Sequence, residues 1–383
     1  MEFLYIILAI SLCSCIFHVL AALCALYFRF FKQEKKYDKE NFPKVSCLKP
    51  LYGFDSELSE NLESHLVQDY PDYEVILGTN TQDDKAYSAA LHLLENKKNA
   101  RLVFGTKGYG ANRKVRNQRN IYDHVSPQAE ILVLSDSDIR VTRDYLSIIT
   151  RPIRQEESVG AVTCLYKVGK TKTLAALLEA LSIESSFAPG VFVASSFAPL
   201  NCAFGATIVL RRKDFIQAGG FEKIENFLAD DNRIGNIIHK LGKKVTLSSY
   251  VVQNMVSCQK VKDALVHLLR WNRTIKVCQP VGYFFSIITH STIWSLAALF
   301  ALGLNARGYA WFTSVCILRI TTACLISFSL GSYYGMLRAF LTPLWDGISS
   351  CLWLAGLLGR DVVWQKVRYS ITPEGEMEEI VKH

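Results

Sequence analysis

The sequence predicts an α/β domain with a mostly parallel β-sheet, preceded by one membrane helix and followed by others. Strand-like and helical patterns alternate between Asp38 and Gln279, an order typical of parallel sheets whose faces are covered by helices. One long apolar run precedes this region and three follow it. Half of the 383 residues are hydrophobic and the formal net charge is +8, which is too apolar a balance for an ordinary soluble enzyme.

The first apolar run, Glu2 to Phe28, has one acid, one histidine and no lysine or arginine, and it is long enough to cross a bilayer. By the positive-inside rule we expect the N-terminus outside and the next domain in the cytosol, because cations follow the run at once. The run lacks the basic start and the cleavage site of a signal peptide, so we expect residues 1–30 to remain as an anchor. The cations are Arg29, Lys32, Lys35 and Lys36.

The domain of residues 38–279 begins with short apolar strands separated by helices. Ser56 stands where a helix N-cap belongs, and Glu57 follows in the first turn. In open parallel sheets the ligand lies at the carboxyl ends of the strands, so polar residues that follow a strand are the candidates for a site. We expect strands at 44–53, 73–80, 101–106 and 130–136, and helices at 56–68 and 86–98.

Residues 280–360 are expected to hold transmembrane helices, and 361–383 a charged tail. The apolar runs at about 309–330 and 334–358 are plausible spans, whereas the run at about 282–304 contains His290 and several hydroxyls and is either interfacial, re-entrant or a third span. Three spans would place the basic tail outside, against the charge rule, and two would keep it in the cytosol. The number of spans stays open.

Eleven cysteines are scattered along the chain, and several of them lie in apolar runs. No C-x-x-C pair occurs. We therefore expect small buried thiols in a reduced compartment, and neither a disulfide framework nor a zinc site.

The apolar strand Ile131 to Leu134 leads directly into Asp136 and Asp138. Two carboxylates two residues apart in a turn can face one point, and hard cations such as Mg²⁺ or Mn²⁺ prefer oxygen ligands shared with a diphosphate. The sequence therefore predicts a divalent metal on Asp136 and Asp138. The alternative is that Asp136 caps a turn and Asp138 is solvated.

Polar groups follow other elements too. Asp83 and Asp84 end the second strand, where a carboxylate can hold a base or ribose, or simply lie in a solvated turn. The stretch Lys107 to Asn120 has five cations, two glycines and no acid. Such a loop suits a phosphate-rich ligand, a lipid headgroup or plain solvation.

Two further motifs lie towards the C-terminus. Asp230 and Asp231 open a predicted helix, where the helix dipole favours acids, and one of them is a candidate general base. The stretch "HLLRWNRTIK" carries Arg270, Trp271 and Arg273 beside the first C-terminal apolar run. These residues either form a membrane-interface belt or hold a departing diphosphate.

In this order the motifs resemble the glycosyltransferases of the GT-A fold, and within them the ceramide glucosyltransferase family (families 2 and 21), over nearly the whole chain. The matching stretches are "LKPLYGFDSELSENLESHLVQDYPDYEV", "SDSDIRV", "ATIVLRRKDFIQAGGF" and "LRWNRTIK". Within the family, "GANRKVRN", "VTCLY", "FLADDNRIG" and "QPVGY" are most similar to the bacterial branch associated with hopanoid biosynthesis.

The resemblance implies a role for each matching residue. Asp84 would help to hold the nucleotide, Asp136 and Asp138 the metal and diphosphate, and Asp231 would be the base. Arg270 and Trp271 match the end of the family's Q/R-x-x-R-W signature, whose first position departs because it is His267. A histidine there implies a weaker or pH-dependent contact with the donor. Further cationic contacts to the UDP-sugar are expected from Arg113, Lys114 and Arg273.

The resemblance implies inverting transfer of a sugar from a UDP-sugar to a membrane lipid at the bilayer surface. It implies a protein of the bacterial inner membrane whose catalytic domain lies in the cytosol. N-acetylglucosamine and a hopanoid polyol (bacteriohopanetetrol) are favoured, with glucose and ceramide as the alternative. Leu174 to Phe197, interrupted by Pro189 and Gly190, is the candidate acceptor-side element or else a core helix.

Other classes of protein fit the sequence less well. A nucleic-acid-binding protein would interleave its cations with aromatic residues, so we expect no nucleic acid partner. An inactive membrane scaffold would have lost the acids, which are all present. A channel or transporter would need more spans with polar residues inside them. The oligomeric state is not indicated.

Overall fold

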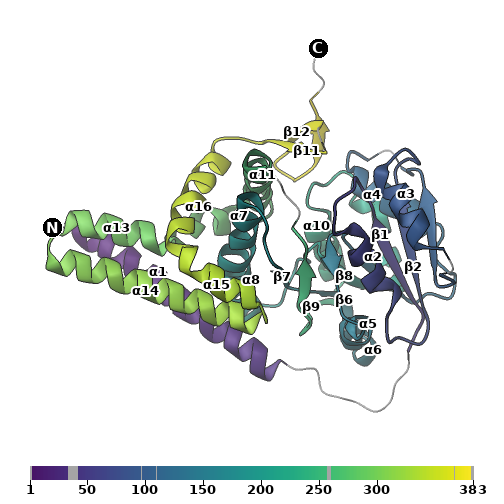
Figure 1. Ribbon diagram of the computed structural model, residues 1–383, viewed down its shortest axis with the longest axis horizontal. Coiled ribbons are helices and arrows are strands. Elements are labelled where there is room, and N and C mark those ends of the chain that lie inside the picture. Colours follow the sequence, from purple (N-terminus) through teal and green to yellow (C-terminus); the bar gives the residue numbers. More distant parts are fainter. Residues whose placement is uncertain are drawn as a thin grey trace.

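The computed structural model describes residues 2–32, 42–95, 97–108, 110–256, 260–365 and 367–380. It has two parts, an α/β domain and a helical part that projects from it (Figure 1). Asp38, where we expect the domain to begin, lies outside the described residues, as do Lys35 and Lys36.

The central sheet has seven strands in the order β3-β2-β1-β4-β8-β6-β9. Neighbouring strands are parallel, except that β8 runs antiparallel to both β4 and β6. This arrangement confirms the predicted α/β class with a mostly parallel sheet, and the early strands lie where the sequence predicts them. The strands are β1 (Val45–Pro50), β2 (Tyr73–Thr79), β3 (Ala100–Phe104), β4 (Ile131–Ser135), β6 (Val159–Thr163), β8 (Thr207–Arg211) and β9 (Lys244–Leu247).

Helices cover the sheet, and two of the predictions about them need correction. The residue before α2 is Glu57, not Ser56, and its backbone N–H donates to Asp55 Oδ1 at 2.8 Å. The basic stretch expected as a loop is helical from Arg113, because the Asn112 side chain caps the first turn and buried apolar residues face the sheet. The helices are α2 (Leu58–Leu66), α3 (Lys85–Leu93), α4 (Arg113–Tyr122), α5 (Tyr145–Ile149), α6 (Arg151–Gln155), α9 (Arg212–Gln217) and α10 (Asp230–Lys240).

Successive residues of the strands point into two apolar clusters, one on each face of the sheet. In β4, Leu132 and Leu134 belong to one cluster, and Ile131 and Val133 to the other, as the two-residue period of a strand requires. The N-terminal helix α1 (Glu2–Phe31) adds Phe28 to the first cluster. Helix α1 thus joins the apolar cluster of the α/β domain, with Phe28 packed on Phe192 of the segment 188–197.

A smaller sheet continues from the carboxyl end of β4. Its order is β5-β10-β7, with β5 (Ile139–Arg140), β10 (Val252–Asn254) and β7 (Tyr166–Val168). Because β5 begins one residue after Asp138, this sheet fixes the backbone at the edge where the predicted site lies.

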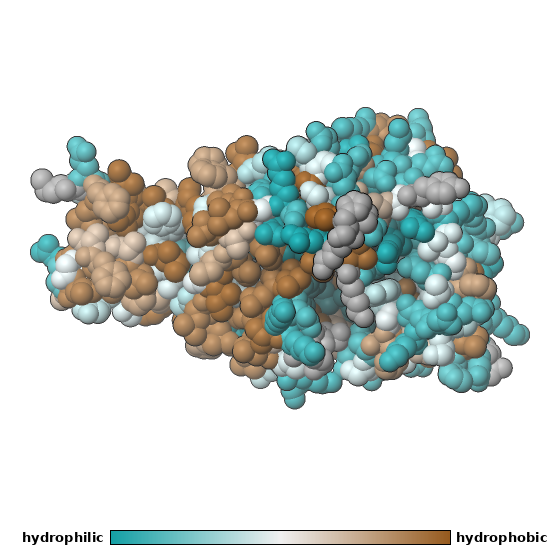
Figure 2. Space-filling view, turned by 90° about the horizontal axis from the view of Figure 1, so that it is seen from above, coloured by the Kyte–Doolittle hydropathy of each residue, from teal (hydrophilic) through white to brown (hydrophobic). Residues whose placement is uncertain are grey.

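The helical part contains segments long and apolar enough to cross a membrane. Among the described residues three qualify by themselves: α1, the segment Leu174–Phe197, and α14 (Ala306–Ser329). The pair Pro280–Thr289 and Ser291–Ala301, bent by 52°, makes a fourth if it counts as one span. Figure 2 shows hydrophobic residues gathered over this part and hydrophilic residues over the α/β domain.

Two of the three apolar runs expected to span the membrane form helical segments of sufficient length, and the third does not. The run 309–330 is α14, which packs with α13 along α1 (Figure 1), and the run 282–304 is the bent pair. The run 334–358 is divided, and its longest helix, α16, has 16 residues and rises about 24 Å, less than the roughly 30 Å of a hydrocarbon core. The helices are α7 (Leu174–Ser182), η1 (Ile183–Phe187), α8 (Ala188–Phe197), α11 (Val261–Cys278), α12 (Pro280–Phe285), η3 (Ser286–Thr289), α13 (Ser291–Ala301), α15 (Tyr333–Arg338), η4 (Ala339–Leu341) and α16 (Thr342–Leu357).

The segment expected as a charged tail contains a three-stranded antiparallel sheet. It docks on the loop before α10, where Met377 N donates to Asn226 O at 2.8 Å and Leu228 N to Gly375 O at 3.3 Å. Leu228 shares an apolar cluster with Tyr369 and other residues of this sheet. The strands are β11 (Asp361–Trp364), β12 (Val367–Ile371) and β13 (Met377–Glu379).

Candidate functional site

Acidic side chains from β4 and α10 meet at the carboxyl edge of the sheet. Lys114 Nζ lies 2.7 Å from Asp136 Oδ1 and 3.5 Å from Asp230 Oδ2, so one cation of α4 links the two elements. A Cβ atom at Gly205 would lie 3.2 Å from Asp231 Oδ2 and 3.6 Å from Asp136 Oδ2. Both carboxylates therefore approach the same stretch of backbone, and glycine at 205 leaves room for them.

The carboxylate of Asp231 is held in place by backbone donors. Gly205 N donates to its Oδ2 and Asn232 N to its Oδ1, each at 2.8 Å. Burial, followed by the negative charge of Asp230, raises the pKa of Asp231 to about 6. A base is most effective when its pKa is near the working pH, so this carboxylate is suited to proton abstraction.

Asp138 lies half-buried beside Asp136. Its backbone is fixed because Met255 N donates to Asp138 O at 2.8 Å. Burial and the charge of Asp136 raise the pKa of the Asp138 carboxyl to about 7. Two carboxylates that repel each other in this way match the oxygen ligands that Mg²⁺ or Mn²⁺ prefers.

These two carboxylates would be the protein's share of a metal site. No cluster of three or more His, Cys, Asp or Glu side chains with the arrangement of a metal site is found among the residues that the structure describes. A metal held by one or two carboxylates takes its remaining ligands from substrate phosphates and water, which is the usual mode for Mg²⁺. The donor set therefore fits a metal that is shared with a nucleotide diphosphate.

Lys49 is a buried cation that the sequence analysis did not single out. Its side chain is fully buried under the Asp136 turn, and Nζ donates to Asp136 O at 2.8 Å and to Ser135 Oγ at 3.2 Å. The third contact is to His65 Nε2 at 3.2 Å, which acts as an acceptor because His65 Nδ1 faces the Asn61 carbonyl at 3.0 Å. Burial lowers the pKa of Lys49 to about 8. The available signal was a lysine within an apolar strand.

Replacing Lys49 by methionine is expected to lower the free energy of unfolding by about 1 to 3 kcal/mol, because buried hydrogen-bonding groups lose their partner. Lys44, a half-buried lysine just before β1 that pairs with Asp72 at 2.8 Å, offers a matched control. Lys44→Met should change stability by no more than about 0.5 kcal/mol. Denaturant unfolding in detergent measures both. Equal losses would mean that Lys49 does not support the turn.

Asp84 caps α3, and Asp83 is exposed. One Asp84 oxygen accepts from Ala86 N at 2.9 Å, and the carboxylate also accepts from Gly53 N at 2.9 and 3.2 Å. Gly53 has φ +69°, a left-handed conformation that glycine adopts without strain. Asp84 thus joins the loop after β1 to α3, and its contact with a nucleotide stays a prediction.

The expected cationic contacts divide into two groups. Lys114 is at the acids. Arg270 on α11 is acted on by the negative charges of Asp231, Glu179, Asp230 and Asp136, although burial lowers its pKa to about 10. The others have partners elsewhere: His267 Nδ1 is 2.8 Å from Glu179 Oε1 and Arg273 donates to Asp361 O. Arg113 interacts with Tyr369. The ring of Trp271 packs edge-on against that of His267, with 4.8 Å between the ring centroids.

One protein-family model matches almost the whole chain. The model described as "Glycosyl transferase family 21" matches residues 6–377. Ceramide glucosyltransferase 3 of Caenorhabditis elegans is 25% identical over 261 residues, 68% of this chain and 56% of that protein. Ceramide glucosyltransferase of Komagataella phaffii is 26% identical over 174 residues, 42% of this chain and 34% of that protein.

The chain spans about half the length of the C. elegans relative and a third of the yeast one. Among solved structures, the mannosyltransferase PcManGT of Pyrobaculum calidifontis, in complex with GDP-mannose and Mn²⁺, is 20% identical. The match covers 89% of this chain and 99% of the mannosyltransferase chain, and its TM-score is 0.48.

Proposed function

Because the chain belongs to glycosyl transferase family 21, we propose that it moves a sugar from a UDP-sugar to the hydroxyl of a membrane lipid, with inversion. The observation that carries this proposal is the meeting of Asp136, Asp138 and Asp231 at the carboxyl edge of the sheet, next to the apolar helices. A water-soluble donor can approach this edge from the aqueous side and a lipid from the bilayer.

In the proposed mechanism Asp231 removes the proton of the attacking hydroxyl. Asp136 and Asp138 would hold Mg²⁺ or Mn²⁺, which when bound supplies positive charge against the departing diphosphate. Arg270, a fixed cation near Asp231 and Asp136, would stabilise the negative charge that develops on the departing diphosphate. Lys114 orients Asp136 through the 2.7 Å ion pair and bridges to α10.

We further propose N-acetylglucosamine as the sugar and a hopanoid polyol as the acceptor, from the resemblance of "GANRKVRN" and "FLADDNRIG" to that bacterial branch. Glucose and ceramide are the second candidate, favoured by relatives that are named ceramide glucosyltransferases. Both candidates use the same base and metal, and they differ in the pockets for sugar and lipid.

We place the protein in the bacterial inner membrane, with 1–30 as anchor, 38–279 as cytosolic domain, 280–360 as membrane helices and 361–383 as a C-terminal segment on the cytosolic side. The cations after α1 support a cytosolic domain. The C-terminal sheet contacts the loop before α10, so it lies on the same side of the membrane as the α/β domain. The helices between must then cross the bilayer an even number of times.

A transfer assay on detergent-solubilised protein with Mn²⁺ tests the proposal. UDP-N-acetylglucosamine and UDP-glucose are each offered with bacteriohopanetetrol and with ceramide. We expect N-acetylglucosaminyl hopanoid, loss of product with EDTA, and recovery with excess Mn²⁺. Glucosylceramide would keep the mechanism and replace the substrates. Product that persists in EDTA would contradict the metal, and no transfer to either lipid would favour an inactive scaffold.

A further inference from the structure

The segment Leu174–Phe197 is a continuous helix that contains one π-helical turn at its centre, for a local reason. Pro189 has no backbone N–H, so the Ser185 carbonyl four residues earlier loses its α-helical donor and is crowded by the proline ring. The chain responds with a π-helical turn, η1 (Ile183–Phe187), between α7 and α8. Such a turn shifts the direction of the side chains that follow it.

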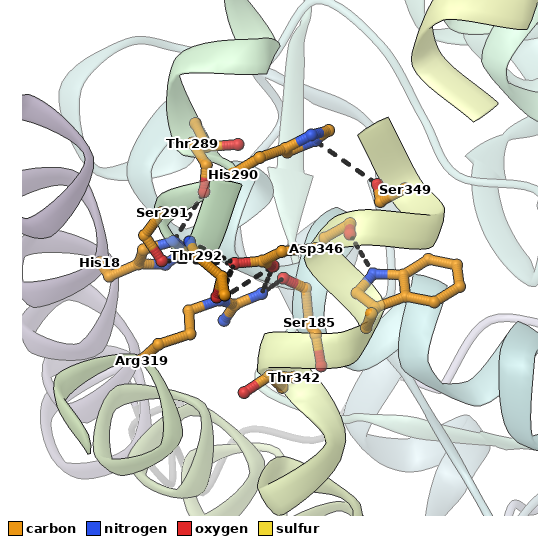
Figure 3. Close-up of polar contacts among 12 residues, drawn as sticks. His18, Ser185, Thr289, His290, Ser291, Thr292, Arg319, Thr342, Asp346 and Ser349 are labelled. Atoms are coloured by element: carbon orange, nitrogen blue, oxygen red, sulfur yellow. Dashed lines mark hydrogen bonds and ion pairs between the residues drawn. The ribbon is translucent and has the colours of Figure 1, made fainter. Parts of the chain in front are cut away.

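The freed carbonyl is satisfied from the membrane helices. Arg319 Nη2 on α14 donates to Ser185 O at 3.0 Å, and the same guanidinium pairs with Asp346 of α16, also at 3.0 Å (Figure 3). Arg319 and Asp346 are 1% and 2% exposed, so the pair is fully buried. Thr292 also donates to Asp346, which ties α13 to the same group.

The neighbouring residues of η1 are held in the same way. Glu184 pairs with Arg338 of α15 at 2.7 Å and accepts from Val168 N of β7 at 3.1 Å. Trp345 Nε1 of α16 donates to Ser186 Oγ at 2.8 Å. Three successive residues of η1 are therefore fixed by α14, α15 and α16, and one of them also reaches β7.

The last residue of η1, Phe187, faces the α/β domain. The centroid of its ring lies 5.0 Å from that of Tyr166, with 27° between the ring planes, so the two rings stack. It lies 5.0 Å from the ring centroid of Phe204, with 88° between the planes, an edge-on contact. Phe204 directly precedes Gly205, whose N–H orients Asp231. All three aromatic side chains are half-buried. An aromatic group thus connects this helix to the predicted base.

Tyr166 is the member of this group with a polar side chain, and the acids of the site act on it. Its pKa is raised first by burial and then by the negative charges of Asp231, Asp136 and Asp138. A phenol beside these carboxylates offers a polar contact at the end of an otherwise apolar surface.

We propose that Tyr166, Phe187 and Phe204 form the wall along which the hydroxyl-bearing end of the lipid acceptor reaches Asp231. This inference rests on the proposed lipid glycosyltransferase function. The rings supply apolar area for the part of the lipid next to its polar end. The wall is attached to the membrane helices through η1, the side from which a lipid arrives.

The test compares two phenylalanines of the same helix. Phe187→Leu is expected to raise the KM for the lipid about 5-fold, which is about 1 kcal/mol and within the range for lost aromatic ring contacts, and to leave the KM for the UDP-sugar unchanged. Hydrolysis of the donor by water should also be unchanged. Phe192→Leu is the control, because the ring contact that the structure shows for Phe192 is with Phe28 of α1, at 5.3 Å between ring centroids.

Tyr166 provides the conservative rescue. Tyr166→Leu should raise the lipid KM as Phe187→Leu does, whereas Tyr166→Phe, which keeps the ring and loses only the polar contact of the phenol, should raise it less. A rise in the donor KM, an equal rise in Phe192→Leu, or an unchanged lipid KM in Phe187→Leu would overturn the wall while leaving the lipid transferase in place. Wild-type protein that hydrolyses the donor but transfers to neither lipid would remove the proposed function and the wall with it.

Discussion

Replacement of Asp231 by asparagine is expected to lower kcat about 10³-fold, within the 10² to 10⁴ range that a general base contributes. The amide has the size of the carboxylate, and its oxygen can still accept from Gly205 N, which now donates to Oδ2 at 2.8 Å. It cannot take the proton of the attacking hydroxyl. The KM for the UDP-sugar should change little, because the donor is held by other residues. Initial rates at saturating lipid measure the effect.

The neighbouring acid is the comparison for this result. Asp230 is buried and lies 3.5 Å from Lys114 Nζ, so Asp230→Asn should affect the ion-pair cluster more than the proton transfer. We expect a kcat loss of about 10-fold or less for Asp230→Asn, as for a single hydrogen-bonded contact. If Asp230→Asn is the more damaging of the two, the base has been assigned to the wrong aspartate.

The pH profile gives an independent check on the same residue. Asp231 works as a base only when it is deprotonated, and its pKa is raised to about 6 by burial and by Asp230. kcat should therefore fall as the pH drops through about 6 and level off above it. The residual activity of Asp231→Asn should lack this acidic limb. A limb that persists in the variant would belong to another group.

The parts of the site that were predicted from the sequence are those with a local signal. An apolar strand that is followed by Asp136 and Asp138, and acids that open a helix at Asp230, can both be recognised from neighbouring residues. The residues that were missed act over long distances in the chain. Lys49 is 87 residues from the Asp136 carbonyl that it binds, and no local pattern indicates that contact.

The two misjudged segments have different physical causes. The basic stretch was expected as a loop because α4 is mostly polar, and only Val115 and Ile121 among its apolar residues are buried. The C-terminal segment was expected as a charged tail because its strands are short, and they gain stability by packing on Leu228 and its neighbours. Tertiary contacts decide both cases.

The second large effect is expected from the buried pair Arg319 and Asp346. Arg319→Met should lower the free energy of unfolding by about 3 to 5 kcal/mol, because it leaves a carboxylate without its cation inside the helical part. Ser185 O would also lose its donor (Figure 3). Thermal or denaturant unfolding in one detergent measures the loss, and a loss of this size is a large fraction of the stability of a typical domain.

A double replacement separates the charge from the packing. In Arg319→Met with Asp346→Asn no charge is left unpaired, and the asparagine oxygen can still accept from Thr292 N, which now donates to Asp346 at 3.1 Å. The double variant should therefore be more stable than Arg319→Met alone, since the cost of an isolated buried charge has been removed. Arg307→Met, at an exposed position in the first turn of the same helix, should change stability by no more than about 0.5 kcal/mol. If the double variant loses as much as the sum of the single changes, Arg319 and Asp346 are not energetically coupled, and the expected cost of an unpaired buried charge is wrong.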